Sequence, residues 1–539
     1  MKQYGIALDL GTSGIRAQAV DLDEGNVISA VISTNHPLPG FNVTDHLHFA
    51  LESGGENAQN IIIRAINQII EGLAIPQSNI IKLAVCGNPI QLALFQGTEI
   101  RDLAFSGIEK LRSMNVEVQH RDAQILSASC FPNLQLPPNC KIIIPPAVCH
   151  EVGADAIALI LQTEMHKHEE TSIAIDFGTN AEIVLFHNGI LKSASAAAGA
   201  AIEGKQIQCG MLAAPGAISD IEHTMDGYQL TVLNSDMLPE KGRIINFSYP
   251  GNDLESNTEL LPIGITGTGT VAIMKEAMGN GLISLPDICT EDKMLHLGKD
   301  IFFTNNDVKE AGKAFGAIRA GYFTLCQDAG ISVEDVQIIY MAGASGTYVD
   351  PVKAQKVGLI PPAVEKVVRA GNTSLAMARQ LVIDETHLDE MTRMANDMRK
   401  NYFSLAASEI FKKVFILELS YWLEGMPMTI YRNLLKVYRF RDMPEIQGKL
   451  NIVNDFNKDS GITTYTNSIT IRKNEDVEIS GCTLCMKCQA GCPVNAISVR
   501  ASPLSPAISV DGSLCLGITC KRCERACLEN VFKLLDFFN

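Results

Sequence analysis

Residues 5–15 read GIALDLGTSGI, residues 172–182 read SIAIDFGTNAE, and this repeated stretch decides the fold. In each copy a short apolar run is followed by Asp, an apolar residue, Gly, Thr and a small polar residue. A second apolar run then follows, at residues 17–20 and 183–186. Two short apolar runs joined by a turn that contains Gly predict a β-hairpin. The two copies therefore predict two lobes built on the same plan.

The sequence between the two hairpins alternates helix and strand signals. Residues 55–73 carry apolar side chains at helical spacing, which predicts a helix. Short apolar runs predict strands at residues 83–86, 91–95 and 141–144. Another helix is expected over residues 152–165. This alternation is typical of an α/β protein.

The alternation continues after the second hairpin. Thr270 is expected to cap a helix that stops at Gly279. Asp307 and Glu310 are expected to form the capping box of the next helix. Residues 335–342 predict a further strand, so the second lobe is also expected to be α/β.

Length and charge exclude some classes of function. A chain of 539 residues has room for several domains. Its formal charge of −16 argues against nucleic acid as a main partner, because phosphate binding needs a basic surface. Its apolar runs are shorter than the 20 or so residues of a membrane span, and Asp9 interrupts the N-terminal run. A cytoplasmic protein that does not bind membranes is expected.

Eight of the 15 cysteines lie between residues 482 and 527. The first run has the spacing C-x2-C-x2-C-x3-C-P, and the second has C-x4-C-x2-C-x3-C. The first spacing is that of bacterial ferredoxins, in which the fourth cysteine of each run binds the other cluster. Two [4Fe–4S] clusters are therefore predicted, one on Cys482, Cys485, Cys488 and Cys527, and one on Cys492, Cys515, Cys520 and Cys523.

The alternative for these cysteines is a pair of zinc sites. Zinc prefers C-x2-C pairs that are set apart, and three cysteines at consecutive x2 spacings do not have that pattern. The second run departs from the ferredoxin pattern in its longer first spacing and in Leu528, which stands where Pro is usual. The other seven cysteines are scattered singly and are expected to be buried.

Both hairpins have the chemistry of a phosphate clamp. A Gly-Thr turn presents backbone N–H groups and a hydroxyl to a concave site. An Asp at the end of the first strand can hold a metal-bound water. The two clamps, expected to face each other across a cleft, are Asp9, Gly11, Thr12 and Ser13, and Asp176, Gly178, Thr179 and Asn180.

Two later glycine turns are expected to line the same nucleotide. Residues 341–347 read MAGASGT and follow a predicted strand, where small residues let a nucleoside lie against the backbone. Residues 264–270 read GITGTGT and stand at a helix start, where N–H groups attract phosphate. The residues predicted here are Gly267, Thr268, Gly269, Gly343, Ala344, Ser345 and Gly346. The expected ligand is ATP with Mg.

This ordered set of motifs resembles the actin, sugar-kinase and Hsp70 (ASKHA) ATPase superfamily. The resemblance implies a two-lobed α/β ATPase, here with a ferredoxin-like domain that holds two [4Fe–4S] clusters. The expected boundaries are a first lobe at residues 1–150, a second lobe at 151–425, a connector at 426–474 and the ferredoxin-like domain at 475–539. Helices near Gly153 and Gly312 stand where the family places its interlobe helices. Their small residues suit either a hinge or close core packing.

A closer resemblance comes from a longer series of motifs. These are AAGAAIEG, GITGTG, DVKEAGKAFGAIRAG, MAGASGTYVD and GNTSLAMARQL. Together with IDFGTNAEIVL they are similar to the ASKHA-type region of reductive activators of corrinoid proteins. The added C-terminal two-cluster domain is similar to the arrangement in the activases that serve the corrinoid proteins of methylamine methyltransferases in methanogens.

The resemblance implies an ATP-dependent oxidoreductase. The implied reaction is reduction of inactive Co(II) corrinoid to Co(I) on methyltransferase corrinoid proteins, in methanogenesis from methylamines. The implied electron path leads from an upstream low-potential donor through the two clusters. The sequence has no D-x-H-x-x-G motif of corrinoid-binding proteins, so the corrinoid is expected on the partner. No catalytic residue is identified.

Three other functions fit part of the pattern. An activator of the 2-hydroxyacyl-CoA dehydratase type is also an ASKHA ATPase. In that type one cluster bridges two subunits, whereas this sequence has eight cysteines in one C-terminal module. A sugar kinase with an appended ferredoxin would need an Asp base that the sequence does not identify. A redox sensor would use nucleotide only for assembly. The basic stretch at residues 432–449 is either a partner contact or a solvated helix face.

Overall fold

The chain divides into two units. The computed structural model describes residues 2–33, 35–40, 42–105, 108–198, 200–204, 206–235, 237–248, 261–446, 448–455, 467–469, 477–501, 506–512 and 514–537. Unit 1 consists of Met1–His150, Ala378–Leu388 and Thr466–Asn539, and unit 2 of Glu151–Met377 and Asp389–Tyr465. The expected connector, residues 426–474, is divided between the units, and its residues 447, 456–466 and 470–474 lie outside the described residues.

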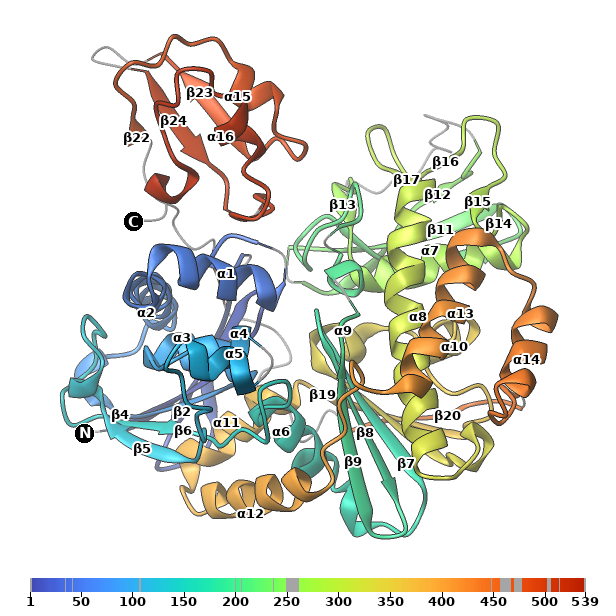
Figure 1. Cartoon of the computed structure of the whole chain (residues 1–539), viewed down its shortest axis with the longest axis horizontal. Coiled ribbons are helices and arrows are strands. Elements are labelled where there is room, and N and C mark those ends of the chain that lie inside the picture. Colours follow the sequence, from blue (N-terminus) through green and yellow to red (C-terminus); the bar gives the residue numbers. More distant parts are fainter. Residues whose placement is uncertain are drawn as a thin grey trace. The chain divides into compact units, whose positions relative to one another are not determined.

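Unit 1 contains a seven-stranded sheet in the order β21-β3-β2-β1-β4-β6-β5. Figure 1 labels β2, β4, β5 and β6 of this sheet. β1 and β2 pair antiparallel, which confirms the first predicted hairpin, and Asp9 lies opposite Arg16. β4 and β6 continue the sheet parallel to β1. Ile6 and Leu8 are fully buried, so β1 is the centre of this sheet. The strands are β1 Tyr4–Leu10, β2 Ile15–Asp21, β3 Val27–Ser33, β4 Ile80–Gly87, β5 Gln124–Ser127, β6 Lys141–Ile144 and β21 Asn467–Ile469.

The helices of unit 1 follow β3 and β4. The helix predicted at residues 55–73 is confirmed as α2, whose isoleucines face the core. The α-helices are α1 Val43–Ser53, α2 Gly55–Gly72, α3 Pro89–Gln96, α4 Arg101–Ala104 and α5 Ile108–Ser113. Short 3-10 turns occur at η1 Gln77–Asn79 and η2 Ala128–Cys130.

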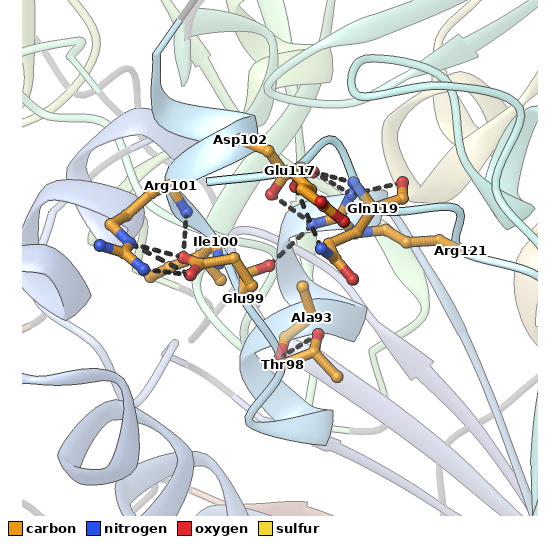
Figure 2. A network of polar contacts seen from close by, with 9 residues as sticks. All are labelled: Ala93, Thr98, Glu99, Ile100, Arg101, Asp102, Glu117, Gln119 and Arg121. Carbon is orange, nitrogen blue, oxygen red and sulfur yellow. Dashed lines mark hydrogen bonds and ion pairs between the residues drawn. The ribbon is translucent and has the colours of Figure 1, made fainter. Parts of the chain in front are cut away.

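A polar network holds the segment between α3 and β5 (Figure 2). Both guanidinium NH groups of Arg121 donate to the Asp102 carboxylate at 2.8 Å, and the Gln119 backbone N–H donates to it at 3.0 Å. Arg121 also donates to the Glu99 carbonyl at 2.8 Å. The Arg101 guanidinium holds the pKa of Glu99 down to about 2. The bidentate pair of Arg121 with the buried Asp102 therefore ties the residues before β5 to α4.

Unit 2 repeats the sheet plan of unit 1. Its six strands have the order β20-β19-β18-β7-β8-β9. β7 and β8 pair antiparallel, which confirms the second hairpin, and β18 and β19 run parallel to β7 on its other side. An antiparallel three-strand meander followed by parallel strands is thus common to both units. The strands are β7 Ser172–Phe177, β8 Ala181–His187, β9 Ile190–Ala196, β18 Ile338–Ala342, β19 Lys366–Gly371 and β20 Asn451–Asn454.

Further elements of unit 2 extend this core. A four-stranded sheet has the order β12-β11-β10-β13, and two short hairpins are β14-β15 and β16-β17. The strands are β10 Ala217–Thr224, β11 Gly227–Leu233, β12 Pro239–Ile245, β13 Gly264–Ile265, β14 Ile283–Ser284, β15 Asp287–Ile288, β16 Met294–His296 and β17 Phe302–Thr304. The α-helices are α6 Ala154–Thr163, α7 Gly267–Gly279, α8 Asn305–Asp328, α9 Gly343–Tyr348, α10 Pro351–Lys356, α13 Glu409–Glu424 and α14 Met428–Val437. The 3-10 turns are η3 Met165–Lys167, η4 Ala200–Glu203 and η5 Val333–Asp335, while α11 Thr373–Ile383 and α12 His387–Lys400 contribute to both units.

The glycines of α8 let α13 pack closely against it (Figure 1). A Cβ added at Gly312 would lie 2.7 Å from the Trp422 Cβ, and one at Gly316 would lie 2.9 Å from the Glu418 Cβ. Arg319 of α8 donates to the buried Glu418 carboxylate at 2.7 Å. Side chains of α13 thus fill the space that the glycines leave. This favours close core packing over a hinge for the small residues of α8.

Replacing Gly312 by Ala is expected to destabilise unit 2 by about 1–3 kcal/mol, because the new methyl group would overlap Trp422. Gly279→Ala is the matched control, since nothing lies within 4 Å of a Cβ added there and Ala has the higher helix propensity. Urea or thermal unfolding of the two variants would measure the difference. Equal stability of Gly312→Ala and the wild type would contradict the packing argument.

The described C-terminal residues of unit 1 form a small module with its own sheet and short helices. Its three-stranded antiparallel sheet has the order β22-β24-β23. Two short helices, α15 and α16, carry cysteines of the first and second runs (Figure 1). The elements are β22 Val477–Glu478, α15 Lys487–Ala490, β23 Ile497–Arg500, β24 Ala507–Val510, α16 Arg522–Ala526 and the 3-10 turn η7 Leu534–Phe537.

One predicted strand is wrong. Residues 91–95 belong to helix α3, although their apolar run resembles a strand. Asn88 caps this helix by accepting a hydrogen bond from the Gln91 backbone N–H, and Pro89 stands in its first turn. A cap and a proline at the first position are helix-start signals that outweigh a short apolar run.

Two predicted helix caps are also wrong. Thr266 rather than Thr270 caps α7, because its hydroxyl accepts from the Gly269 N–H at 3.0 Å. The capping box of α8 joins Thr304 to Asp307, and Glu310 pairs instead with a lysine one turn later. The helix ends fall near the predicted positions.

Of the seven scattered cysteines, Cys130 and Cys289 are exposed, so the expectation of burial is wrong for them. Cys86, Cys140 and Cys326 are buried as expected. In the part of the chain that the structure describes, no helix is both long and apolar enough to cross a membrane.

Candidate cluster and nucleotide sites

The structure places the first predicted cysteine set around one pocket. Cys482, Cys485, Cys488 and Cys527 all line it, together with apolar side chains that include Phe532. Cys488 lies in α15, and Cys527 directly follows α16, so the set joins the two runs. Cys488 and Cys527 are buried, whereas Cys485 is exposed.

The second predicted set also comes together across the two runs. Burial, together with the neighbouring sulfurs of Cys523, Cys492 and Cys520, raises the pKa of the Cys515 thiol to about 12. Burial likewise raises the pKa of Cys523 to about 11, again with Cys492 and Cys520 nearby. Buried thiols with high pKa values lose their protons when a metal binds them.

The donor chemistry of these sites fits iron–sulfur clusters. Each set offers four thiols, and thiolates are the ligands that such clusters use. Leu484, Met486 and Lys521 adopt positive φ angles, which turn the chain tightly between neighbouring cysteines. The Lys487 backbone N–H lowers the pKa of Cys485 by hydrogen bonding to its sulfur. Gly517, with φ of +82°, accommodates the longer spacing between Cys515 and Cys520.

Within the described ranges, no three His, Cys, Asp or Glu side chains converge closely enough to hold a single metal ion. A cubane differs from such a site, because its four thiolates bind four different irons. The two cysteine sets therefore stay predicted cluster sites, each defined by its four residues.

The first predicted phosphate hairpin has a buried acid, Asp9, near the end of β1. Asp9 is 7% exposed and forms an ion pair with Arg16 at 3.3 Å. Thr12 lies at the turn, where its hydroxyl accepts a hydrogen bond from the Asn88 side chain at 3.1 Å. Ser13 is buried and Gly11 is partly exposed. The structure thus groups these four predicted residues at the end of β1.

The second hairpin meets the glycine-rich start of α9, residues 343–346, inside unit 2. β7 and β18 are neighbours, and Ala342 lies opposite Asp176. A Cβ added at Gly343 would lie 2.1 Å from the Asp176 carboxylate, and Gly343 has φ of +84°, so only glycine fits there. The side chains of Ala344 and Ser345 lie outside the described part. Thr179 donates a short hydrogen bond to Glu203.

Residues 267–269 reach the same region from α7. A Cβ on Gly267 would overlap the Ile202 carbonyl, and one on Gly269 would overlap the Ile218 carbonyl. The Thr268 hydroxyl donates to the Ser219 carbonyl at 2.7 Å. These residues therefore serve close packing of the α7 start, and their predicted contact with nucleotide stays a prediction.

Sequence reasoning missed one acid of this site, Glu182. It lies on β8 directly opposite Asp176 and is 5% exposed. Burial raises the pKa of the Glu182 carboxyl well above its usual range, and the negative charges of Asp155 and Asp176 raise it further. The sequence did contain a signal for Glu182. Residues that face each other across a hairpin point to the same side, so a hairpin that contains Asp176 also predicts its cross-strand neighbour.

Replacing Glu182 by Gln is expected to raise the melting temperature of the nucleotide-free protein at neutral pH. A carboxyl whose folded pKa is raised contributes stability below its unfolded pKa, and this contribution is lost as pH rises through the folded pKa. The neutral amide removes that loss. Thermal unfolding between pH 5 and 8 would measure it, with the exposed Glu409→Gln as control. Identical pH profiles for Glu182→Gln and the wild type would contradict the expectation.

A duplicated sheet with an Asp-x-Gly-Thr hairpin in each copy is the architecture of the ASKHA class. Two family models match the chain: the C-terminal ASKHA domain of RACo at residues 170–432, and the RACo middle region at residues 4–168. The chain is also 40% identical over 519 residues to a [Co(II) methylated amine-specific corrinoid protein] reductase of Methanosarcina barkeri, covering 95% of each protein.

Two other relatives are more distant. The chain is 26% identical over 418 residues to the corrinoid activation enzyme RamQ of Eubacterium limosum, covering 70% of this chain and 64% of RamQ. A solved reductive activator for a corrinoid, iron–sulfur protein has the same fold, with a TM-score of 0.65 at 22% identity, covering 79% of this chain and 68% of that one. The chain belongs to the family of RACo-type reductive activators of corrinoid proteins.

Proposed function

We propose that this protein uses ATP to reduce the inactive Co(II) corrinoid of a methylamine methyltransferase corrinoid protein to Co(I). The observation that carries the proposal is the 40% identity over nearly the whole chain to a relative named for methylated amine-specific corrinoid proteins. The match covers 95% of this chain and 95% of the relative. The partner is then a corrinoid protein, and the electron comes from an upstream low-potential donor.

Each unit offers one hairpin whose residues suit phosphate binding. Asp9 and Asp176 occupy the same position in the two copies of the repeat, each at the end of a central strand. Hard carboxylate oxygens are the ligands that Mg²⁺ prefers, so the Asp176 carboxylate would suit the magnesium of MgATP. The Gly-Thr turns would bind the phosphates through backbone N–H groups.

The two cysteine sets would hold two [4Fe–4S] clusters, and when bound these supply one-electron carriers. The described residues around them bury half of the eight predicted ligands. Cys488, Cys515, Cys523 and Cys527 are all buried. Cys485 is the exposed ligand, and the exposed Met486 follows it, so the first set offers the more open edge for electron exchange.

ATP is needed because Co(I) is a strong reductant. Each 100 mV of unfavourable potential costs about 2.3 kcal/mol for one electron. Nucleotide binding can offset this only through different affinities for two states of the protein. ATP is proposed to favour the form that docks on the corrinoid protein and makes its cobalt easier to reduce.

The test is anaerobic incubation of the cluster-loaded protein with purified Co(II) corrinoid proteins, a low-potential reductant and MgATP, following the cobalt absorption spectrum. Co(I) is expected to form only when protein and ATP are both present. The mono-, di- and trimethylamine proteins would each be offered, with a methanol-specific corrinoid protein for comparison. Equal rates with and without ATP, for every corrinoid protein, would overturn the proposal.

A further inference from the structure

A line of hydrogen bonds leads from the first phosphate hairpin into the core of unit 1. The Asn88 side-chain amide donates to the Thr12 hydroxyl at 3.1 Å. The carbonyl oxygen of the same side chain accepts from the Gln91 backbone N–H at 3.0 Å and so caps α3. Any displacement of Thr12 by a bound phosphate therefore acts on the start of α3.

The line continues to α1 through two fully buried side chains. The Gln91 amide and the His46 Nδ1 atom are 2.7 Å apart, and both residues are 0% exposed. An amide NH₂ group can only donate, so Nδ1 accepts. The His46 ring stacks on His36 with centroids 4.0 Å apart. A buried polar group that loses its partner is costly, so Gln91 and His46 must move together.

The far end of α1 contacts the cysteine module within unit 1. Glu52 stands in the last turn of α1, and its carboxylate accepts from the Lys521 ammonium at 2.6 Å. Lys521 directly follows Cys520 of the second cysteine set. An exposed ion pair contributes little stability by itself. Its position is the informative feature, because it joins α1 to a loop that carries predicted cluster ligands.

We infer that α1 couples the nucleotide hairpin to the second cysteine set. Thr12, Asn88, Gln91 and His46 form the inner part of this connection, and Glu52 with Lys521 forms its outer part. Phosphate at Thr12 shifts Asn88 and Gln91, His46 carries the shift to α1, and Glu52 passes it to the loop at Lys521. The inference rests on the proposed function, because it gives ATP a physical path to the predicted clusters.

Hydrogen exchange of the full-length, cluster-loaded protein tests the inner part. In the wild type, MgATP is expected to slow exchange in residues 43–53 and 515–523. Gln91→Met keeps the side-chain length but removes the amide, so it is expected to bind MgATP and to lose both changes. Gln59→Met is the matched control, because the Gln59 amide also donates to α3, at the Phe95 carbonyl, but is not on the line.

The outer part is tested at the surface, where substitution does not disturb folding. Glu52→Gln is expected to keep the ATP-induced change in residues 43–53 and to lose it in residues 515–523. The double variant Glu52→Lys with Lys521→Glu is expected to restore it. If Gln91→Met does not fold, this pair decides the inference.

Two outcomes overturn the inference. One is an unchanged exchange rate of residues 43–53 on addition of MgATP to the wild type. The other is a full response of residues 515–523 in Glu52→Gln. Failure of the proposed function is distinguishable, because it would appear as no binding of MgATP or as reduction of Co(II) that is independent of ATP.

Discussion

Replacing Cys527 by Ser is expected to remove about half of the bound iron and to reduce the rate of Co(I) formation by about 100-fold or more. A hydroxyl is a poor substitute for a soft thiolate ligand. Cys527 lines the pocket of Cys482, Cys485 and Cys488, although it belongs to the second run. Its loss should therefore affect the first cysteine set. Iron and sulfide analysis and EPR of the reduced protein would measure it.

The pattern among variants tests the assignment across the two runs. Cys527→Ser is expected to lose the same EPR component as Cys485→Ser, and Cys492→Ser the same component as Cys520→Ser. Cys289→Ser is the matched control, because Cys289 is exposed and lies in unit 2. The assignment would be refuted if Cys527→Ser lost the component that Cys520→Ser loses. Zinc in place of iron would refute both clusters.

Replacing Asp176 by Asn is expected to abolish detectable binding of MgATP and to lower ATP-dependent reduction by about 100-fold or more, the scale of losing one well-placed electrostatic contact. The Asp176 carboxylate lies against Gly343. It occupies the space that a Cβ would take there, and the positive φ of Gly343 also favours glycine. Asn keeps the shape but removes the charge that is proposed to hold the magnesium. Calorimetry with MgATP and the cobalt assay would measure the two effects.

Asp328→Asn is the matched control for this substitution. Asp328 lies in the same unit at the end of α8, where it forms an ion pair with Lys192 outside the nucleotide site. It is expected to bind MgATP and to reduce Co(II) as the wild type does. The role given to Asp176 would be wrong if Asp176→Asn bound MgATP with unchanged affinity.

Much of the fold was predictable, because it depends on local patterns. The two hairpins, α2 and β6 follow directly from apolar periodicity and from Gly-Thr turns. The pattern failed for residues 91–95, where an apolar run of strand length is a buried helix. Periodicity cannot separate the two when every side of a segment is buried.

The candidate site was predictable only in part. Asp9 and Asp176 stand out because the motif occurs twice. Glu182 did not, because its importance comes from lying opposite Asp176 across the hairpin. The glycines of residues 267–269 pack against backbone carbonyls, and their expected contact with phosphate stays a prediction. Glycine permits both, and the sequence alone does not say which atoms come close.

The sequence by itself determined the repeated hairpins, the two cysteine runs and the resemblance to corrinoid activators, since each is a pattern of residue types at short spacing. Only the tertiary structure decided which residues come together from distant segments. It placed Asp155 beside Glu182, Trp422 against Gly312, and His46 against Gln91. The physical reason is that such contacts depend on how whole helices and sheets pack, and packing is set by the sum of many weak interactions along the entire chain.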